Sequence, residues 1–340
     1  MCRSPSRLAP SKVKIHGVTT LLIAKVAISV ALVAVVLRQV EFAKIVTNLS
    51  AARPLYVTAC LLTAVPIITI SAWRWTILAQ GLINFQIALK YVLIGAFYGS
   101  ILPGTISSDI ARGAALAARS KAMRNVVLPA SILVDRLIGL AALGAIASIG
   151  FILAYVESPA GLAQFKSALM AGAVISSFLA VLPIFIFSTW FERLIRSPLR
   201  WRAVGALRTW IERILSARSA YTATPTLLLR AIFLSLAMHI FSVLGYIFAL
   251  RALNIAFSPT SVVILFSCLS MILLLPISVA GVGVREAFSL LFFAVLGASG
   301  DQAVAFSWLL LSTGLFVALI GAGVQILELH RPTDIHGSDT

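Results

Sequence analysis

Charged residues at the borders of long apolar segments are the first candidates for chemistry in this sequence. They are Asp109, Arg112, Asp135, Arg136, Arg285 and Glu286. An ionised side chain inside a bilayer costs about 2.5–3.5 kcal/mol on insertion scales, so it normally faces the protein interior and has a partner. Guanidinium groups offer planar, forked donors that suit a phosphate. We expect Arg112 and Arg285 to bind a lipid phosphate, with the three acids orienting them and Arg136 completing the site.

A purely structural role for the same residues is the alternative. Asp109 and Arg112 are spaced i, i+3, which allows an ion pair on one face of a helix. The neighbouring charges Asp135-Arg136 and Arg285-Glu286 would then only fix helix ends at the membrane interface.

Proline and glycine mark the segments that must position these charges. Arg112 follows Pro103-Gly104 and Arg285 follows Pro276, and each arginine stands nine residues after its proline. The glycines Gly281 and Gly283 lie in the second gap, where close backbone approach explains them better than a dinucleotide loop, which needs a third glycine. This spacing predicts two related broken elements, in repeat halves of about residues 85–155 and 260–328.

The composition requires a membrane environment for the whole chain. The 340 residues are 60% hydrophobic and only 11% charged, against about 45–50% and 25% in soluble proteins. The apolar runs are too long and too regular for barrel strands, so the fold class is an all-α polytopic transmembrane helical bundle. We expect a cytoplasmic tail over 1–17, a transmembrane domain over 18–328 and a C-terminal tail over 329–340.

About seven to nine spans are predicted from the apolar runs. The strongest runs are Val18–Leu37, Pro54–Trp73, Leu137–Tyr155, Ser167–Phe187, Thr226–Leu250, Ser261–Val279 and Ala303–Leu327, with a shorter run at Glu286–Leu296. The second ends in Ala72-Trp73-Arg74-Trp75, which is typical of an interface anchor.

The positive-inside rule conflicts with a simple count of these spans. Residues 107–136 and 189–230 are rich in arginine and are expected in the cytoplasm. A full span over 89–102 would place the first of these stretches outside. We therefore predict that Tyr91–Ile106, broken by Gly95, Gly99, Pro103 and Gly104, is re-entrant. Three spans separate the two broken elements, so the repeats would be inverted and would meet near the membrane midplane.

Several functions are disfavoured. The net charge of +16 is distributed between apolar runs, where membrane orientation explains it without nucleic acid. None of the lysines follows a glycine, so a Walker A loop is absent from the sequence and no nucleotide cofactor is expected. Scattered cysteines and histidines predict no metal site.

The motifs around these charges resemble those of the transmembrane domain of lysylphosphatidylglycerol synthases, a flippase-like family. They are Ile101–Gly104 with Asp109–Arg112, Val134–Leu140, and Pro276–Glu286. The resemblance covers about Val18–Glu328 and implies lipid translocation in a bacterial plasma membrane. The sequence departs from the family at Ser107-Ser108, where a glycine pair is common, and it ends at Thr340 without the soluble transferase domain.

We therefore expect a translocase, and not an enzyme, that moves an anionic or modified phospholipid or a polyprenyl lipid between leaflets. Two alternatives remain open. One is an accessory subunit with a lipid-synthesis enzyme as partner. The other is a membrane-embedded lipid transferase that uses Asp109, Asp135 or Glu286 as a base.

Overall fold

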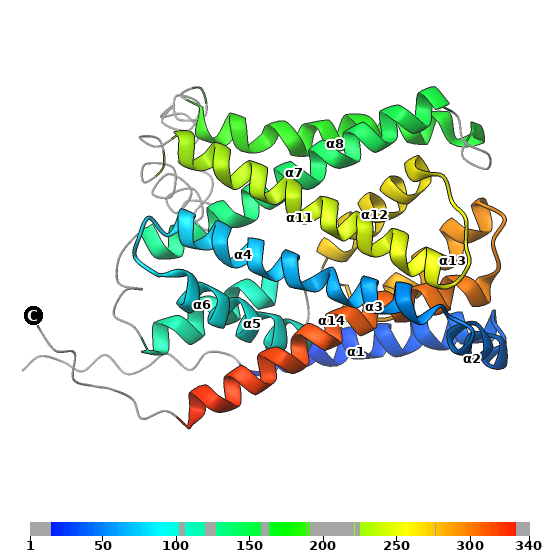
Figure 1. Ribbon diagram of the computed structural model, residues 1–340, viewed down its shortest axis with the longest axis horizontal. Coiled ribbons are helices and arrows are strands. Elements are labelled where there is room, and N and C mark those ends of the chain that lie inside the picture. The colour runs from blue at the N-terminus through cyan, green and yellow to red at the C-terminus, as the bar shows by residue number, and fades with distance from the viewer. Residues whose placement is uncertain are drawn as a thin grey trace, which may run out of the picture.

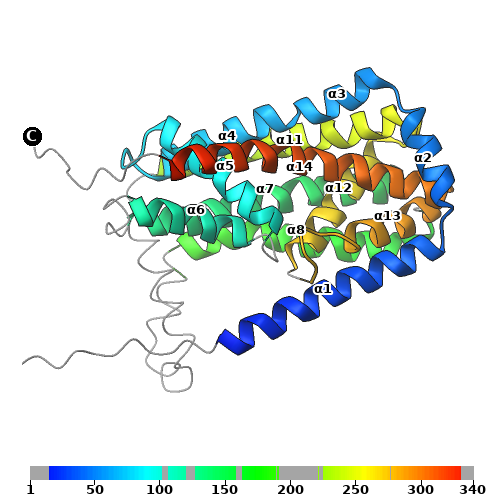
Figure 2. The ribbon, with the colours of Figure 1, turned by 90° about the horizontal axis from the view of Figure 1, so that it is seen from below.

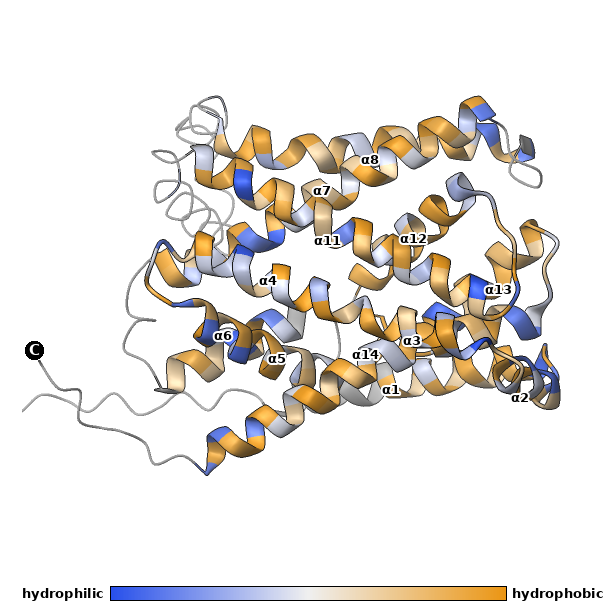
Figure 3. Cartoon of the chain, in the orientation of Figure 1, coloured by the Kyte–Doolittle hydropathy of each residue, from blue (hydrophilic) through white to orange (hydrophobic). Residues whose placement is uncertain are grey.

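The architecture is that of a computed structural model, which describes residues 15–101, 106–119, 127–157, 163–188, 190, 221, 225–275 and 277–330. The described residues form helices and short connections, without an extended strand. Most of the helices run side by side along the long axis of the molecule (Figure 1). Hydrophobic residues cover most of their length (Figure 3). The predicted polytopic helical bundle is confirmed.

Five segments are long and apolar enough to cross a membrane. They are α3 (Pro54–Leu62) with α4 (Ala64–Leu78), α7 (Val127–Glu157), α8 (Lys166–Phe187), α11 (Pro225–Ala252) and α14 (Gly300–Leu329). A sixth candidate is α1 (Ile15–Arg38), which is followed after an 87° bend by α2 (Phe42–Ser50). The predicted number of seven to nine spans is too high for the described residues, because several apolar runs form helices too short to cross.

These shorter helices form two broken pairs. The first is α5 (Phe85–Ile101) with α6 (Ile106–Arg119), and the second is α12 (Pro259–Leu274) with α13 (Val284–Val295). The α5–α6 pair occupies one end of the bundle and the α12–α13 pair occupies the other, in both views (Figures 1 and 2). In each pair, the second helix runs back toward the end of the bundle at which the first one starts (Figures 1 and 2). The helix break expected around residue 100 is therefore confirmed, and the re-entrant path through the membrane stays a prediction.

The break in the first pair is not at the two glycines that we expected to contribute to it, because α5 continues through Gly95 and Gly99. These glycines instead let α6 approach closely. A Cβ atom on Gly95 would lie 2.8 Å from the carbonyl oxygen of Ser108, and one on Gly99 would lie 2.8 Å from the Ser108 Cβ. The small residues thus hold the two arms of the hairpin together.

The α14 helix fixes this hairpin within the bundle. A Cβ atom on Gly321 would lie only 2.1 Å from the carbonyl oxygen of Leu93, so α14 and α5 cross at backbone contact. At the other end of the bundle, the buried rings of Phe293 on α13 and Phe306 on α14 pack with centroids 5.3 Å apart. One long helix therefore positions both broken pairs.

Several helix ends gather at one end of the bundle. They are the start of α1, the end of α6, the start of α7, the end of α8, the start of α11 and the end of α14 (Figures 1 and 2). The two arginine-rich stretches of the sequence include or adjoin these helix ends. By the positive-inside rule we expect this to be the cytoplasmic end. Most of the second arginine-rich stretch, residues 191–220, lies outside the described residues.

Candidate functional site

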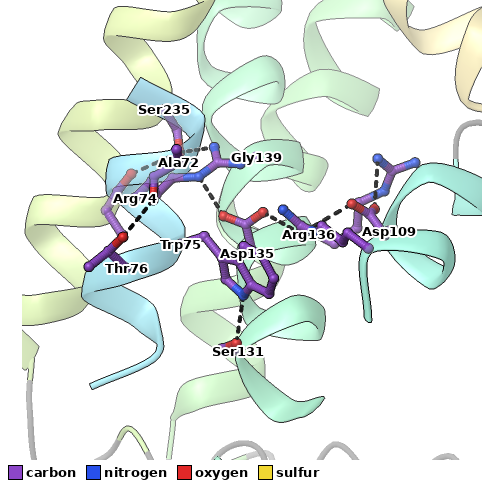
Figure 4. A network of polar contacts seen from close by, with 12 residues as sticks. Ala72, Arg74, Trp75, Thr76, Asp109, Ser131, Asp135, Arg136, Gly139 and Ser235 are labelled. Atoms are coloured by element: carbon purple, nitrogen blue, oxygen red, sulfur yellow. Dashed lines mark hydrogen bonds and ion pairs between the residues drawn. The ribbon is translucent and has the colours of Figure 1, made fainter. Parts of the chain in front are cut away.

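A buried carboxylate, that of Asp135, organises the polar residues inside the bundle. Its Oδ1 accepts a hydrogen bond of 2.6 Å from Arg74 Nε, and its Oδ2 accepts one of 2.8 Å from Arg112 Nη2. All three residues are at most 6% exposed. Figure 4 shows Asp135 pointing at Arg74 across the space between α7 and α4. Two cations on one buried anion keep the carboxylate charged and join three helices, α4, α6 and α7.

The position of Asp135 corrects two expectations. We expected a span beginning at Leu137, with Asp135 and Arg136 at its interface, but α7 begins at Val127. The pair therefore lies inside the helix, and the alternative in which it only fixes a helix end is wrong. Hydropathy places the helix start too late because it treats a charge as a boundary, whereas here the partner arginines compensate the charge.

Arg74 is a site residue that the sequence argument missed. It was taken as part of an interface anchor, but its side chain is buried and its Nη1 also donates a 2.6 Å hydrogen bond to Ser235 Oγ of α11. The neighbouring Trp73 is 55% exposed and keeps the outward position that we expected of the whole motif. In a helix with 3.6 residues per turn, Arg74 lies on a different face from Trp73. This periodicity was the sequence signal that could have shown that Arg74 is buried.

Arg112 is held by several neighbours through its Nη2 and its planar face, while its Nε is buried without a hydrogen-bond partner. Its Nη2 also lies 3.1 Å from Asp109 Oδ1, which confirms the i, i+3 ion pair. Its guanidinium carbon lies 4.7 Å from the ring centre of Trp75, and the indole Nε1 in turn donates to Ser131 Oγ. Arg112 is thus held in place by two carboxylates and an aromatic face. It is not among the residues lining the cavity described below, so it does not face Arg285 as expected.

Arg136 is the most accessible cation of this series. Its Nη1 lies 3.4 Å from Asp109 Oδ2, and its side chain is 30% exposed, against 5% for Arg112. Figure 4 shows Arg136 and Asp109 side by side, beyond Asp135. The continuous series Arg74, Asp135, Arg112, Asp109 and Arg136 contains three cations and two anions, which leaves one positive charge in excess.

A cavity of about 450 Å³ lies where the two broken helix pairs meet. The first pair contributes Gly99, Ser100 and Ser108, and the second contributes Ser278, Gly281 and Arg285. Arg136 of α7 also lines it, as do apolar residues of α4, α12 and α14. The structure therefore brings two of the predicted arginines to one cavity, but these are Arg136 and Arg285.

Arg285 lacks a carboxylate partner among the described residues. Its Nη2 donates to the carbonyl oxygen of Ala280 at 3.2 Å, while its Nη1 is buried without a hydrogen-bond partner. Glu286 does not orient it as expected, since its Oε2 accepts a 2.7 Å hydrogen bond from the backbone N–H of Gly283 and caps α13. A buried donor without an acceptor costs about 1–3 kcal/mol, which an anion bound at this place would recover.

The loop that presents Arg285 is bent sharply. Gly281 and Gly283 have φ of +77° and +84°, and a Cβ atom on Gly283 would lie 2.7 Å from Leu32 Cβ of α1. Both observations confirm the close backbone approach expected of these glycines. Ala280 also has a positive φ, of +51°, which is strained for a residue with a side chain. Such strain occurs most often at functional sites.

The equal proline spacing does not place the two arginines equivalently. Arg112 is the seventh residue of α6, whereas Arg285 is the second residue of α13. Most of the residues between Pro276 and Arg285 precede α13, whereas most of those between Pro103 and Arg112 belong to α6. Pro103, Gly104 and Pro276 themselves lie outside the described residues. No cluster of metal-binding side chains was found among those that the structure describes.

The chain as a whole matches one protein family. The model of the lysylphosphatidylglycerol synthase transmembrane region aligns with residues 22–321, which include both broken pairs and every residue of the site. The chain belongs to this family. No curated protein and no solved structure matches it. As a member of the lysylphosphatidylglycerol synthase transmembrane family it is a multi-pass integral membrane protein, which the long apolar helices also show.

Proposed function

We propose that this chain moves an anionic lipid between the leaflets of a bacterial plasma membrane. The observation that carries this proposal is the cavity shared by Arg136 and Arg285 between the two broken helix pairs. The buried network has one positive charge in excess, and Arg285 adds a second that no described carboxylate neutralises. Such a cavity favours a phosphate, which accepts several charge-assisted hydrogen bonds.

The arrangement of the helix pairs suggests how a headgroup would cross. The pairs enter the bundle from opposite ends (Figures 1 and 2), and three spans, α7, α8 and α11, separate them along the chain. We infer that they are inverted repeats. In transporters of that design the site stays near the midplane, while the two repeats alternately close it from each side. The lipid headgroup would bind between the two broken helix pairs, whichever side of the membrane the cavity is open to.

The residues of the site support binding better than catalysis. Asp109 and Asp135 are held by arginines, and Glu286 caps a helix, so each acid has a structural partner. A general base must reach a proton of its substrate, and these carboxylates are occupied. The proposal is therefore transport without a chemical step on the lipid.

Reconstitution in vesicles tests the proposal. Purified protein would be placed in phosphatidylcholine vesicles that contain a fluorescent phosphatidylglycerol or phosphatidylcholine, and the labelled lipid in the outer leaflet would be quenched chemically. We expect faster loss of phosphatidylglycerol fluorescence than in protein-free vesicles, and a smaller effect on phosphatidylcholine. Equal rates with and without protein for anionic lipids would contradict the proposal. Co-purification of a lipid-synthesis enzyme with an inactive protein would favour an accessory subunit instead.

A further inference from the structure

The cavity between the two broken helix pairs has one polar wall and one apolar wall. Its guanidinium and hydroxyl groups come from the two broken helix pairs and from α7. The apolar lining comes from α12 and α14, through Leu273, Leu275, Leu311 and Leu315. A site for a soluble anion has no need of a leucine wall. A lipid needs both walls, because its phosphate binds the polar wall and its hydrocarbon contacts the leucine wall.

One position on the apolar wall is open. A Cβ atom on Gly314 would meet nothing within 4 Å, although Gly314 lines the cavity. By contrast, Gly321 on the same helix is at backbone contact with α5. A glycine inside a helix costs about 1 kcal/mol relative to alanine. Packing does not require this one, so its effect is to leave space at the cavity wall.

Two of the leucines that line the cavity have exposed side chains. Leu315 of α14 and Leu275 at the end of α12 line the cavity, yet they are 49% and 57% exposed. Since α14 is a 30-residue apolar span, its exposed side chains contact lipid. The cavity therefore opens sideways, toward hydrocarbon, between α14 and the tip of the second helix pair.

From this opening we infer a lateral portal formed by Gly314, Leu315 and Leu275, through which a hydrocarbon chain of the bound lipid leaves the cavity. The inference rests on the proposed function and adds to it the place at which the hydrocarbon of the lipid leaves the headgroup site. A cavity of about 450 Å³ is at the lower end of the range for small-ligand sites. It therefore holds the headgroup, while the chains remain in the bilayer.

Two glycine variants on α14 distinguish a block of the portal from the general effect of adding a large side chain to this helix. Gly314→Trp fills the proposed opening, and Gly323→Trp is its matched control, because a Cβ atom on Gly323 also meets nothing within 4 Å and Gly323 does not line the cavity. Binding of dioleoyl phosphatidic acid and of glycerol 3-phosphate would be measured in detergent for each variant. Thermal unfolding would establish that both variants are folded, and Gly314→Leu provides a smaller block.

If the portal exists, blocking it should weaken the binding of the long-chain lipid but not that of glycerol 3-phosphate. Gly314→Trp should weaken binding of the long-chain lipid about tenfold, equivalent to about 1.4 kcal/mol, and leave glycerol 3-phosphate unchanged. Gly323→Trp should affect neither ligand. Unchanged lipid binding in Gly314→Trp would overturn the portal, as would an equal loss of both ligands, because the tryptophan would then simply fill the headgroup site.

A photoreactive lipid gives a second test that needs no variant. Phosphatidic acid with a diazirine in its acyl chain should label Leu275 and Leu315 in the wild-type protein, and labelling spread evenly over the outer helices would contradict the portal. Failure of the portal and failure of transport are distinguishable. If the lipid binds through Gly314 but the wild-type protein does not accelerate transfer in vesicles, the portal stands and the translocation proposal falls.

Discussion

Arg136 of α7 and Arg285 of α13 line the same cavity, although 149 positions separate them in the sequence. Their environments differ. Arg136 is paired with Asp109 at 3.4 Å, whereas Arg285, among the described residues, bonds to a backbone carbonyl and has one buried nitrogen without a partner. A phosphate would therefore gain most from Arg285, and it would have to share Arg136 with an aspartate.

Arg285→Met tests this difference through stability and binding together. The substitution removes a buried donor that has no partner, so we expect the free energy of unfolding to stay the same or to rise by about 1 kcal/mol. Affinity for phosphatidic acid should fall at least tenfold. Thermal unfolding in detergent and lipid binding measure the two effects. A marked loss of stability with unchanged affinity would make Arg285 a structural residue.

Arg112→Met should behave in the opposite way. Arg112 bonds to Asp135 and stacks on Trp75, and its removal leaves carboxylates with fewer partners. We expect a loss of stability of about 3–5 kcal/mol, the usual cost of breaking a buried ion pair from one side. Lipid affinity of the remaining folded protein, measured below its unfolding temperature, should stay within about threefold of the wild type. A large, selective loss of affinity in a stable protein would return Arg112 to the binding site.

Asp135→Asn probes the centre of the network. The carboxylate of Asp135 accepts hydrogen bonds from Arg74 and Arg112, so its neutralisation leaves two buried cations poorly paired. We expect it to destabilise the protein by about 3–5 kcal/mol. Glu41→Gln, which breaks the exposed pair between Glu41 and Lys44 at 2.8 Å, is the control and should cause no measurable change. Equal unfolding temperatures for both variants would contradict the role assigned to Asp135.

The glycines of the first helix pair provide a packing prediction. Gly95→Ala places a Cβ atom 2.8 Å from a backbone oxygen of α6, so α5 and α6 must separate, and we expect a loss of about 1–3 kcal/mol. Gly323→Ala, at an open position, should instead stabilise α14 by about 1 kcal/mol. Chemical denaturation of the two variants checks the signs. Stabilisation by both substitutions would show that helix propensity, and not the α5–α6 contact, controls these positions.

The sequence was sufficient for the helical class and for the first broken pair, because the positive-inside rule constrains how often a chain can cross. It was not sufficient for the partners of the arginines. Whether Arg112 or Arg136 faces the cavity depends on where α6 and α7 begin and how each is rotated. Those starts lie near charges and prolines, where hydropathy is least informative. Arg74 was missed for a related reason, since one turn of α4 carries both an exposed tryptophan and a buried arginine.

The most direct measurement compares lipid transfer by two double variants in vesicles. Arg136→Gln with Arg285→Gln removes both cations of the cavity, while Arg38→Gln with Arg251→Gln removes the same charge from exposed positions. The account predicts that the first double variant inserts and folds but loses the acceleration of anionic lipid transfer, and that the second keeps it. Transfer at the wild-type rate by the first double variant would contradict the central claim.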